Sequence, residues 1–525
     1  MPRKLSARPV PPRSAAPAAQ ARPASPDKPK SASSVPVTVP VVVFVLSIVL
    51  CFAHMGRLVE LFYPAMCLLV ALWLYRVYPA QYLGFTCWVF FLTPEVRRLA
   101  DFFAGSFNPV STIMVAPLGC AAMSGLALIT DARMLGQRRA APLMMIIAGL
   151  AYAWLIGMSR AGFSAATFAL TGAVFPALVG FRLVATWEHH PDYQRVLLKT
   201  FIYGAIIMGA YGIWEFISPP PWDAFWLLAS GMTSEGHPVP FGMRVSSTMN
   251  SSGPFASTAL VCILMSLAGK GKLRLAAGVV LPALMFTSVR SAWGGLLVGL
   301  IYPIAMLDGR SRMRLIAGVF ACLALCLPVT MLDGVGDHIT ERMETVQDIS
   351  QDNSYQVRAE MYSSFMSRAL TDISGQGFGT TGIASKLADS DSDVIQVFDS
   401  GIMEVPYIMG WPGTLLFISG TLTLLWRALS ASRKRPEDHF GACGVGVAIA
   451  VLSMMVFSNT LAGMTGMFYF IGVLMPVNGA RYAREKRTDA LRETPPPGSA
   501  GTARERRDLE PAARPRATLT SEAVS

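Results

Sequence analysis

An arginine lies within a long apolar stretch near the middle of this 525-residue chain. It is Arg290, in the run F-T-S-V-R-S-A-W-G-G-L, and apolar residues continue on both sides. A charged side chain beside a membrane span is costly and often marks a functional site. The guanidinium stays charged and can bind a phosphate group through two parallel hydrogen bonds. The alternative is an arginine that only reaches the lipid headgroups, and the residues alone favour neither interpretation.

A second arginine, Arg244, opens the run R-V-S-S-T-M-N-S-S-G-P-F-A, which ends where the next apolar stretch begins. Backbone N–H groups of such a run, together with the first turn of a following helix, can bind an anion. Ser and Asn are also favoured as ordinary helix N-caps. Alone, this run is therefore a weak indicator of an anion site.

Two carboxylates, Asp399 and Glu404, lie where a later apolar stretch begins, in the run D-S-G-I-M-E-V-P-Y-I-M-G-W-P-G. A carboxylate at the mouth of a span can accept a proton from a hydroxyl group as a general base. The alternatives are an N-cap role for Asp399 and a buried, hydrogen-bonded acid for Glu404.

The only large hydrophilic region between apolar stretches covers about residues 333–401, and it is rich in Asp and Glu. It contains S-Y-Q-V-R, which ends at Arg358, and a G-Q-G-F-G run from Gly375 to Gly379. No strand precedes the glycines, so they do not form a dinucleotide motif. They predict a flexible turn after a surface or re-entrant helix. A connection of this length in a compact protein is more often functional than not.

Membrane helices must position these residues. The chain is 53% hydrophobic and only 15% charged, whereas soluble domains carry about a quarter charged residues. Its mean hydropathy of +0.45 excludes a cytosolic enzyme and a disordered chain. Apolar stretches of about 20 residues recur, long enough to cross a hydrocarbon core of about 30 Å. The predicted fold class is an all-α, polytopic integral membrane protein with about 14 (12–14) transmembrane helices and one large loop on the outer face that contains short helices.

The predicted spans are residues 36–54, 59–75, 78–93, 109–128, 141–158, 164–184, 196–217, 253–268, 273–288, 291–307, 314–332, 402–426, 440–458 and 461–479. Lys and Arg recur in every second connection between them, which is the positive-inside pattern. This pattern places both termini in the cytoplasm and the loop 333–401 outside. The net charge of +11 therefore does not indicate a nucleic-acid partner.

The chain divides into three parts. Residues 1–34 are basic and rich in Pro, Ala and Ser, so they predict a disordered cytoplasmic tail. Residues 35–480 form the polytopic membrane domain. Residues 481–525 predict a second disordered cytoplasmic tail.

In their order along the chain, the four runs around Arg244, Arg290, Arg358 and Asp399 resemble the O-antigen ligase and polymerase family of bacterial inner membranes. The family includes lipopolysaccharide O-antigen ligases, O-antigen polymerases and exopolysaccharide polymerases. The resemblance covers about residues 140–480, and the ordered set of runs is more specific than any one of them.

The resemblance implies a metal-independent glycosyltransferase that uses polyprenyl-pyrophosphate-linked glycans at the periplasmic face. It assigns pyrophosphate binding to Arg244 and Arg290 and matches Arg358 to a further loop arginine. The family's ligases carry a histidine near the end of the large loop, where this chain has Asp399–Ser400–Gly401. That difference favours an exopolysaccharide or O-antigen polymerase. It leaves the base open between Asp399 and Glu404, and His338 does not match the position.

No metal and no other cofactor is expected. The expected partners are a polyprenyl-pyrophosphate-linked oligosaccharide, the lipid bilayer, and a chain-length regulator with export machinery. Two alternatives stay open: an O-antigen ligase that transfers glycan to a lipid acceptor, and a transporter or flippase of lipid-linked sugars. A transporter is expected to show internal repeats, and none is evident in this sequence.

Overall fold

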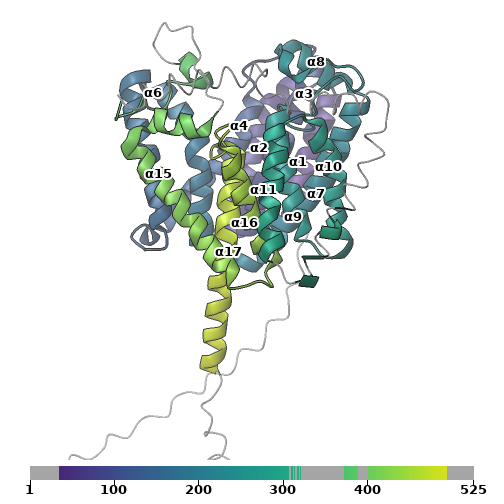
Figure 1. Cartoon of the computed structure of the whole chain (residues 1–525). Helices are drawn as coiled ribbons and strands as arrows, with labels where there is room; N and C mark the ends of the chain where they lie inside the picture. Colours follow the sequence, from purple (N-terminus) through teal and green to yellow (C-terminus); the bar gives the residue numbers. More distant parts are fainter. Residues whose placement is uncertain are drawn as a thin grey trace, which may run out of the picture.

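The structure is a computed structural model that describes residues 35–306, 372–387 and 400–493, with residues 309–310, 312–313, 316–318 and 320 between them. Helices and turns make up this part of the chain, which contains no strand beyond one isolated bridge between Gly236 and Met243. The all-α fold class predicted from the sequence is confirmed (Figure 1).

The elements in chain order are α1 (Val35–Phe52), α2 (Gly56–Val77), α3 (Pro79–Ala104), η1 (Thr112–Met114), α4 (Val115–Ala122), η2 (Met123–Leu126), α5 (Ala127–Thr130), η3 (Ala132–Met134), α6 (Ala141–Ala185), η4 (Trp187–His189), α7 (His190–Ile217), α8 (Pro221–Ser230), η5 (Thr233–Glu235), α9 (Ser252–Leu267), η6 (Gly271–Leu275), α10 (Ala276–Phe286), α11 (Arg290–Met306), η8 (Gly382–Leu387), α15 (Gly401–Arg433), α16 (His439–Met454) and α17 (Gly463–Glu493). Among the described residues, six helical stretches are long and apolar enough to cross a membrane, and α9 and α16 are shorter apolar helices. The chain is a multi-pass membrane protein.

Each predicted span before residue 308 and after residue 401 coincides with a helix or a short series of helical turns. The span predicted at 314–332 lies almost entirely outside the described residues. The helix predicted at 78–93 is longer, because α3 continues to Ala104. Helix α17 likewise continues to Glu493, past residue 481, and Arg481 pairs with Glu485 one turn further on at 3.3 Å.

Helix α6 is two antiparallel helices joined at Gly162, where φ is +83°. Its two halves meet along their length. The Trp154 indole donates to the Thr167 hydroxyl at 3.1 Å, and Gly180 packs against the Leu143 side chain. A positive φ is open to glycine at little cost, so one residue makes the tight turn that the sequence predicts between two spans.

Helix α9 occupies the centre of the helix bundle. All of its residues except Gly253 and Pro254 are buried, and it packs against α7, α10, α11 and α16. A helix that is apolar on every side belongs in such a core. Close glycine contacts bring α11 to its neighbours: Gly299 lies against the Gly446 carbonyl of α16 and against Leu264 of α9.

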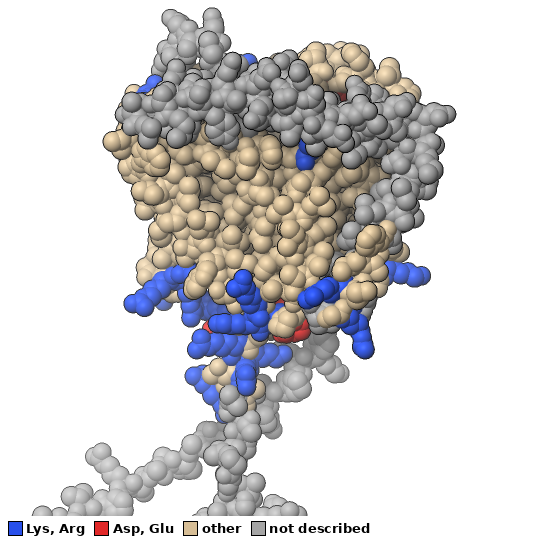
Figure 2. All heavy atoms as spheres, viewed as in Figure 1, with Lys and Arg blue, Asp and Glu red and all other residues tan. Residues whose placement is uncertain are grey.

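Basic side chains gather at one end of the molecule, below a broad band on its side that shows almost no charged side chains (Figure 2). Here Arg427 donates to the carbonyl oxygens of Arg138 and Arg139, and Arg182 pairs with Asp131 at 3.7 Å. The last part of α17 extends from this end, whereas α8 lies at the opposite end (Figure 1). The connections predicted as cytoplasmic from their charge therefore meet on one face.

Candidate functional site

The structure brings together the two arginine-containing runs predicted from the sequence. The Arg244 Nε donates to the Thr287 carbonyl at 3.0 Å, and the Val245 N–H donates to the Phe286 carbonyl at 3.2 Å. Phe216 at the end of α7 stacks on Phe286, with ring centroids 4.1 Å apart and planes 8° from parallel. The segment carrying Arg244 is thus fixed against the turn that leads into Arg290.

Both runs contain a non-glycine residue with a positive φ. Ser247 has a φ of 50° and Ser288 a φ of 56°. This conformation is uncommon outside glycine, and such strain clusters at functional sites because the surrounding structure must hold it in place. The Val289 N–H donates to the Thr287 hydroxyl at 3.2 Å, which fixes the turn immediately before Arg290.

Arg290 is the first residue of α11 and is partly exposed. A cation is unfavourable at a helix N-terminus because the helix macrodipole is positive there. The helix therefore gains no stability from this charge. The same end of a helix favours a bound anion, and an arginine beside it adds to that preference.

The N–H groups around Ser246 do not form the backbone anion site that the sequence suggests. Glu215 Oε2 accepts the N–H groups of Ser246 at 3.1 Å and Ser247 at 2.6 Å, and Glu235 accepts that of Ser252 at 3.3 Å. Carboxylates of the chain itself occupy these three donors. These contacts do not involve the other N–H groups of the run, so an anion site there stays a prediction.

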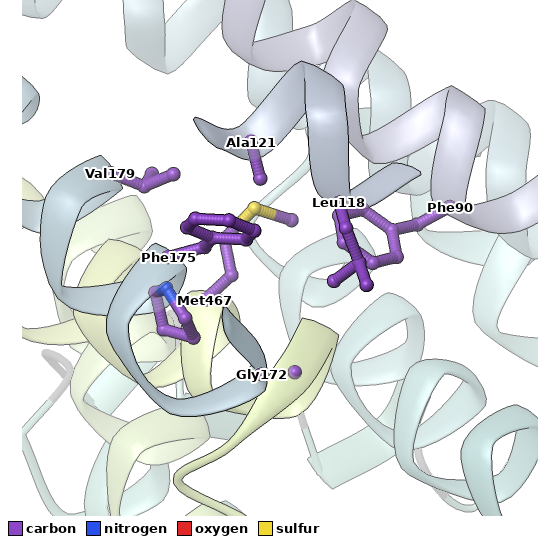
Figure 3. A pocket seen from close by; sticks show the side chains of 9 residues that line it. Phe90, Leu118, Ala121, Gly172, Phe175, Val179 and Met467 are labelled. Atoms are coloured by element: carbon purple, nitrogen blue, oxygen red, sulfur yellow. The ribbon is translucent and has the colours of Figure 1, made fainter. Parts of the chain in front are cut away.

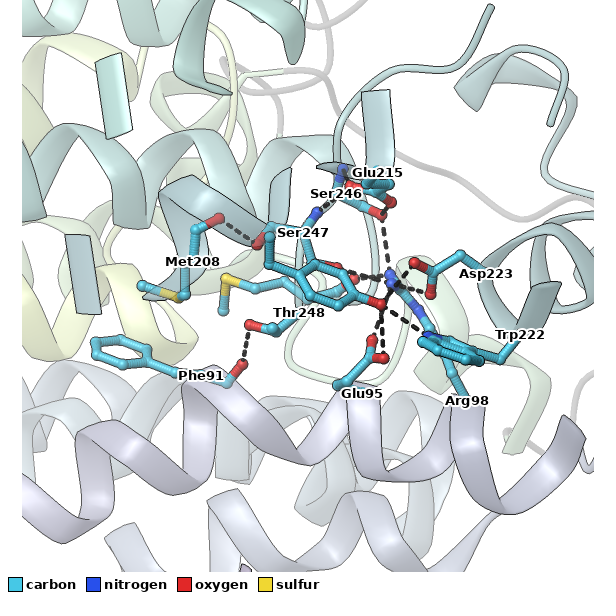
Figure 4. A network of polar contacts seen from close by, with 12 residues as sticks. Phe91, Glu95, Arg98, Met208, Glu215, Trp222, Asp223, Ser246, Ser247 and Thr248 are labelled. Carbon is cyan, nitrogen blue, oxygen red and sulfur yellow. Dashed lines mark hydrogen bonds and ion pairs between the residues drawn. The ribbon is translucent and has the colours of Figure 1, made fainter. Parts of the chain in front are cut away.

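A buried polar network lies beneath this run (Figure 4). Arg98 of α3 is 2% exposed. Its guanidinium donates to Asp223 of α8 at 2.8 Å, to the Ser247 carbonyl at 2.7 Å, to the Ser246 hydroxyl at 2.9 Å and to the Met249 carbonyl. We call Glu95, Arg98, Tyr211, Glu215 and Asp223 the Arg98 network. The sequence analysis missed it, although Glu95, Arg98 and Asp101 follow one another at helical spacing beside an apolar stretch.

The Tyr211 hydroxyl lies between two carboxyl groups of the Arg98 network. It lies 2.7 Å from Glu95 Oε1 and 2.8 Å from Asp223 Oδ2, and it accepts a hydrogen bond from Trp222 at 2.8 Å. A hydroxyl has one proton to donate, so one of these two carboxyls must be protonated to complete both contacts. Burial also raises the pKa of Asp223 above its usual range, although the Arg98 charge opposes that shift.

Glu404 lies in the first turn of α15 and is partly buried. Asn459, in the connection between α16 and α17, lies beside this side chain. The adjoining Gly401 N–H donates to the Met455 carbonyl at 2.8 Å. Gly295 of α11 packs against the neighbouring Met454, so the starts of α11 and α15 both adjoin the end of α16. Asp399, Arg358 and His338 lie outside the described residues.

Comparison with known families gave one match. Residues 252–418 match the family model described as O-Antigen ligase. The chain carries a domain of the O-antigen ligase family. This match confirms the resemblance inferred from the sequence, and it supports a function of the ligase or polymerase type. Searches of the curated proteins and of the solved structures found no match.

The O-antigen ligase family domain begins at α9 and ends within α15. It contains Arg290, Arg358, Asp399 and Glu404, whereas Arg244 lies just before it. The Arg98 network also precedes it. The candidate site thus combines the matched segment with helices from the N-terminal half of the chain.

The turn predicted at the G-Q-G-F-G run of this family domain is packed into the protein: four of its five residues are buried, and Gln376 is partly buried. We call residues 372–387 the glycine segment. It lies between the tip of α6 and a kink in α15 at Gly410, where φ is +57°. Its backbone N–H groups at Gln376, Gly377 and Phe378 donate to the carbonyls of Tyr407 at 2.8 Å, Ile408 at 2.9 Å and Ala153 at 3.0 Å, in that order.

An ion pair joins the start of the glycine segment to α6. Arg160 lies 3.1 Å from Asp372 and donates to the Ser374 hydroxyl at 3.1 Å. Partial burial raises the pKa of Asp372, but the Ser374 hydrogen bond and the Arg160 charge outweigh it, so this pKa lies below its usual value. Both partners are far apart in the sequence, which is why the sequence analysis did not pair them.

Neither an apolar hollow nor a metal site adds chemistry to these residues in the part of the chain that the structure describes. A small hollow between α3, α4, α6 and α17 is lined by apolar residues such as Leu118, Phe175 and Met467 (Figure 3). Within the described ranges, no three His, Cys, Asp or Glu side chains are grouped so as to hold a metal ion.

Proposed function

We propose that this protein is an inner-membrane polysaccharide polymerase that joins polyprenyl-pyrophosphate-linked repeat units at the periplasmic face. The observation that carries the proposal is the 3.0 Å hydrogen bond from Arg244 to Thr287, which places two arginine-containing runs side by side. Arg244 also follows α8, which lies at the end of the molecule opposite the basic face. The positive-inside rule makes that basic face cytoplasmic.

The reaction requires a stabilised leaving group. The acceptor hydroxyl attacks the sugar carbon that bears the pyrophosphate, the bond to the pyrophosphate oxygen breaks, and a glycosidic bond forms. Polyprenyl pyrophosphate departs with the electron pair of the broken bond. Arg244, Arg290 and Arg358 provide fixed positive charges for it. Preorganised charges in a partly dry site stabilise such developing charge without reorganisation.

The acceptor hydroxyl must also lose a proton. Asp399 and Glu404 are the proposed bases, at the start of α15. The start of α15 and the start of α11 adjoin the same end of α16, which supports placing the base near Arg290. A general base contributes about two to four orders of magnitude to such a step.

The second candidate is an O-antigen ligase, because that is the description of the matched family. A polymerase and a ligase share the donor and differ in the acceptor. Purified protein in vesicles is supplied with lipid-linked repeat units alone, then with repeat units plus a lipopolysaccharide core lipid. A ladder of polymer on the polyprenyl carrier with repeat units alone supports the polymerase. Product that forms only on the core lipid contradicts it and supports the ligase.

A further inference from the structure

Two buried charges of opposite sign hold the segment that follows Arg244. Arg98 binds the acceptor atoms of this segment, namely the carbonyls of Ser247 and Met249 and the Ser246 hydroxyl. Glu215 is 0% exposed and accepts the N–H groups of Ser246 and Ser247 and the Ser246 hydroxyl, the last at 2.8 Å. The backbone polar groups at these positions are thereby matched to a cation on one side and an anion on the other.

We propose that Arg98 and Glu215 are positioning residues that fix the Arg244 guanidinium for the glycan donor. This inference rests on the proposed function, because it assigns a role to Arg244. It also extends the site beyond residues 252–418 to α3 and α7. The helices before the matched domain then hold part of the catalytic apparatus.

Arg98 makes more contacts than the packing of α3 against α8 needs. A buried ion pair is weak evidence for stability, since apolar residues of similar volume often serve as well. Arg98 has one ion pair to α8, through Asp223, but three contacts to the short segment from Ser246 to Met249. That segment contains Ser247 with its positive φ, a conformation that persists only where neighbouring groups impose it.

The path from the Arg98 network to Arg244 is short. Ser246 is two residues from Arg244, and the intervening Val245 donates its N–H to Phe286. A shift of the segment from Ser246 to Met249 therefore moves the origin of the Arg244 side chain. A misplacement of about 1 Å reduces catalysis by about a hundredfold in well-studied enzymes.

The test is a double-mutant cycle on turnover, with Arg98→Lys, Arg244→Lys and the double variant in vesicles. Lysine keeps the charge of Arg98, but its compact ammonium cannot reproduce the planar fork of five donors through which the guanidinium reaches separate acceptors. Arg98→Lys is expected to lower turnover about tenfold in the wild-type background. In the Arg244→Lys background the same change is expected to lower it less than about twofold, because coupled residues are not additive.

A matched control separates positioning from general stability. Tyr82 lies on the same helix as Arg98, is 1% exposed, and donates to the Cys120 carbonyl at 2.7 Å, away from the Arg244 segment. Tyr82→Phe is expected to have the same effect in both backgrounds. If Arg98→Lys lowers turnover by the same factor in the wild-type and the Arg244→Lys backgrounds, the positioning role is overturned while the proposed function stays intact. Normal turnover of the Arg244→Lys variant overturns both the positioning role and the proposed function.

A second variant covers the case in which Arg98→Lys fails to fold. Ser246→Ala removes the hydroxyl that contacts both Arg98 and Glu215, and it leaves the Arg98–Asp223 ion pair in place. Measured well below its melting temperature, it is expected to raise the KM for the lipid-linked donor or lower kcat about tenfold. Wild-type kinetics for Ser246→Ala contradict the positioning role.

Discussion

Gly377 in the glycine segment packs directly on the backbone of Gly157 in α6. A methyl group on Gly377 would overlap the Gly157 nitrogen, and one on Gly157 would overlap the backbone of Phe378. Gly377 also has a φ of +80°. The contact therefore has no room for any side chain, and it holds the glycine segment between α6 and α15.

Gly377→Ala is expected to destabilise the protein by more than the strain of its backbone conformation alone. Gly382→Ala is the matched control, because Gly382 has a φ of +63° in the same segment with open space around it. The control should cost about 1–2 kcal/mol, the usual penalty for a side chain in this region. Thermal unfolding in detergent measures both variants, and equal melting temperatures would show that the contact with Gly157 is unimportant.

Arg290→Lys and Arg244→Lys are expected to leave protein levels normal and polymer strongly reduced. A lysine ammonium is a point charge and cannot reproduce a two-pronged contact with pyrophosphate. Losing one charge-assisted hydrogen bond costs about 1.5–3 kcal/mol, which is about ten- to a hundredfold in rate. Single lipid-linked repeat units should accumulate. Arg195→Lys, at an exposed position, is the control. A wild-type polymer ladder from both Arg290→Lys and Arg244→Lys would contradict the pyrophosphate contact.

Asp399→Asn is expected to retain the fold and donor binding and to lower turnover by about two to four orders of magnitude. The amide keeps the shape of the carboxylate but cannot accept the proton from the acceptor hydroxyl. Donor binding and turnover are measured separately on the same preparation. Near-normal polymer would instead favour the N-cap role for Asp399, and Glu404→Gln is then the next variant to measure.

The glycine segment is expected to loosen in acid. The pKa of Asp372 in the folded protein is lowered, so the carboxylate contributes stability that is present above its unfolded pKa of about 3.9. This contribution is lost as the pH falls through the lower folded value. Hydrogen exchange at Gln376 and Gly377, followed from pH 6 downward at matched intrinsic rates, should speed up in wild type. Asp372→Asn should show faster exchange already at pH 6 and little further change, and identical profiles would argue against the Arg160–Asp372 pair.

The orientation is checked by reporter fusions at Asp352 and Lys434. The charge pattern places the first outside and the second in the cytoplasm. An alkaline phosphatase fusion should be active only at Asp352, and a green fluorescent protein fusion should fluoresce only at Lys434. Reporters that give the same side for both positions contradict the topology.

The helices were predictable because the signal that defines them is local. Runs of apolar residues between basic connections predicted the spans that became α1, α2, α7, α9 and α16. The two arginine runs were predictable for the same reason, since a charge or a cluster of hydroxyl residues stands out against apolar neighbours.

The contacts that assemble the site were not predictable from local sequence. In the sequence, Arg98 is one of four charged residues near the end of α3, and its partners Asp223 and Ser247 belong to distant segments. The run G-Q-G-F-G is compatible with a flexible loop and with a tight packing surface. The close contacts of Gly377 with the Gly157 backbone and of Gly375 with the Gly410 backbone show that the run is a packing surface.

The buried charges of α3 also set the order in which the chain can assemble during synthesis. Arg98 is translated 125 residues before Asp223 and 149 residues before Ser247. Until those residues leave the ribosome, the end of α3 carries charges that lipid cannot accommodate cheaply. Although Arg98 can pair with Glu95 on its own helix, we expect this end of the helix to stay in a wet environment until then, in the translocation channel or at the membrane surface. The N-terminal helices cannot complete their packing before α8 and the Arg244 segment arrive, so the donor site closes only after half of the protein has been made.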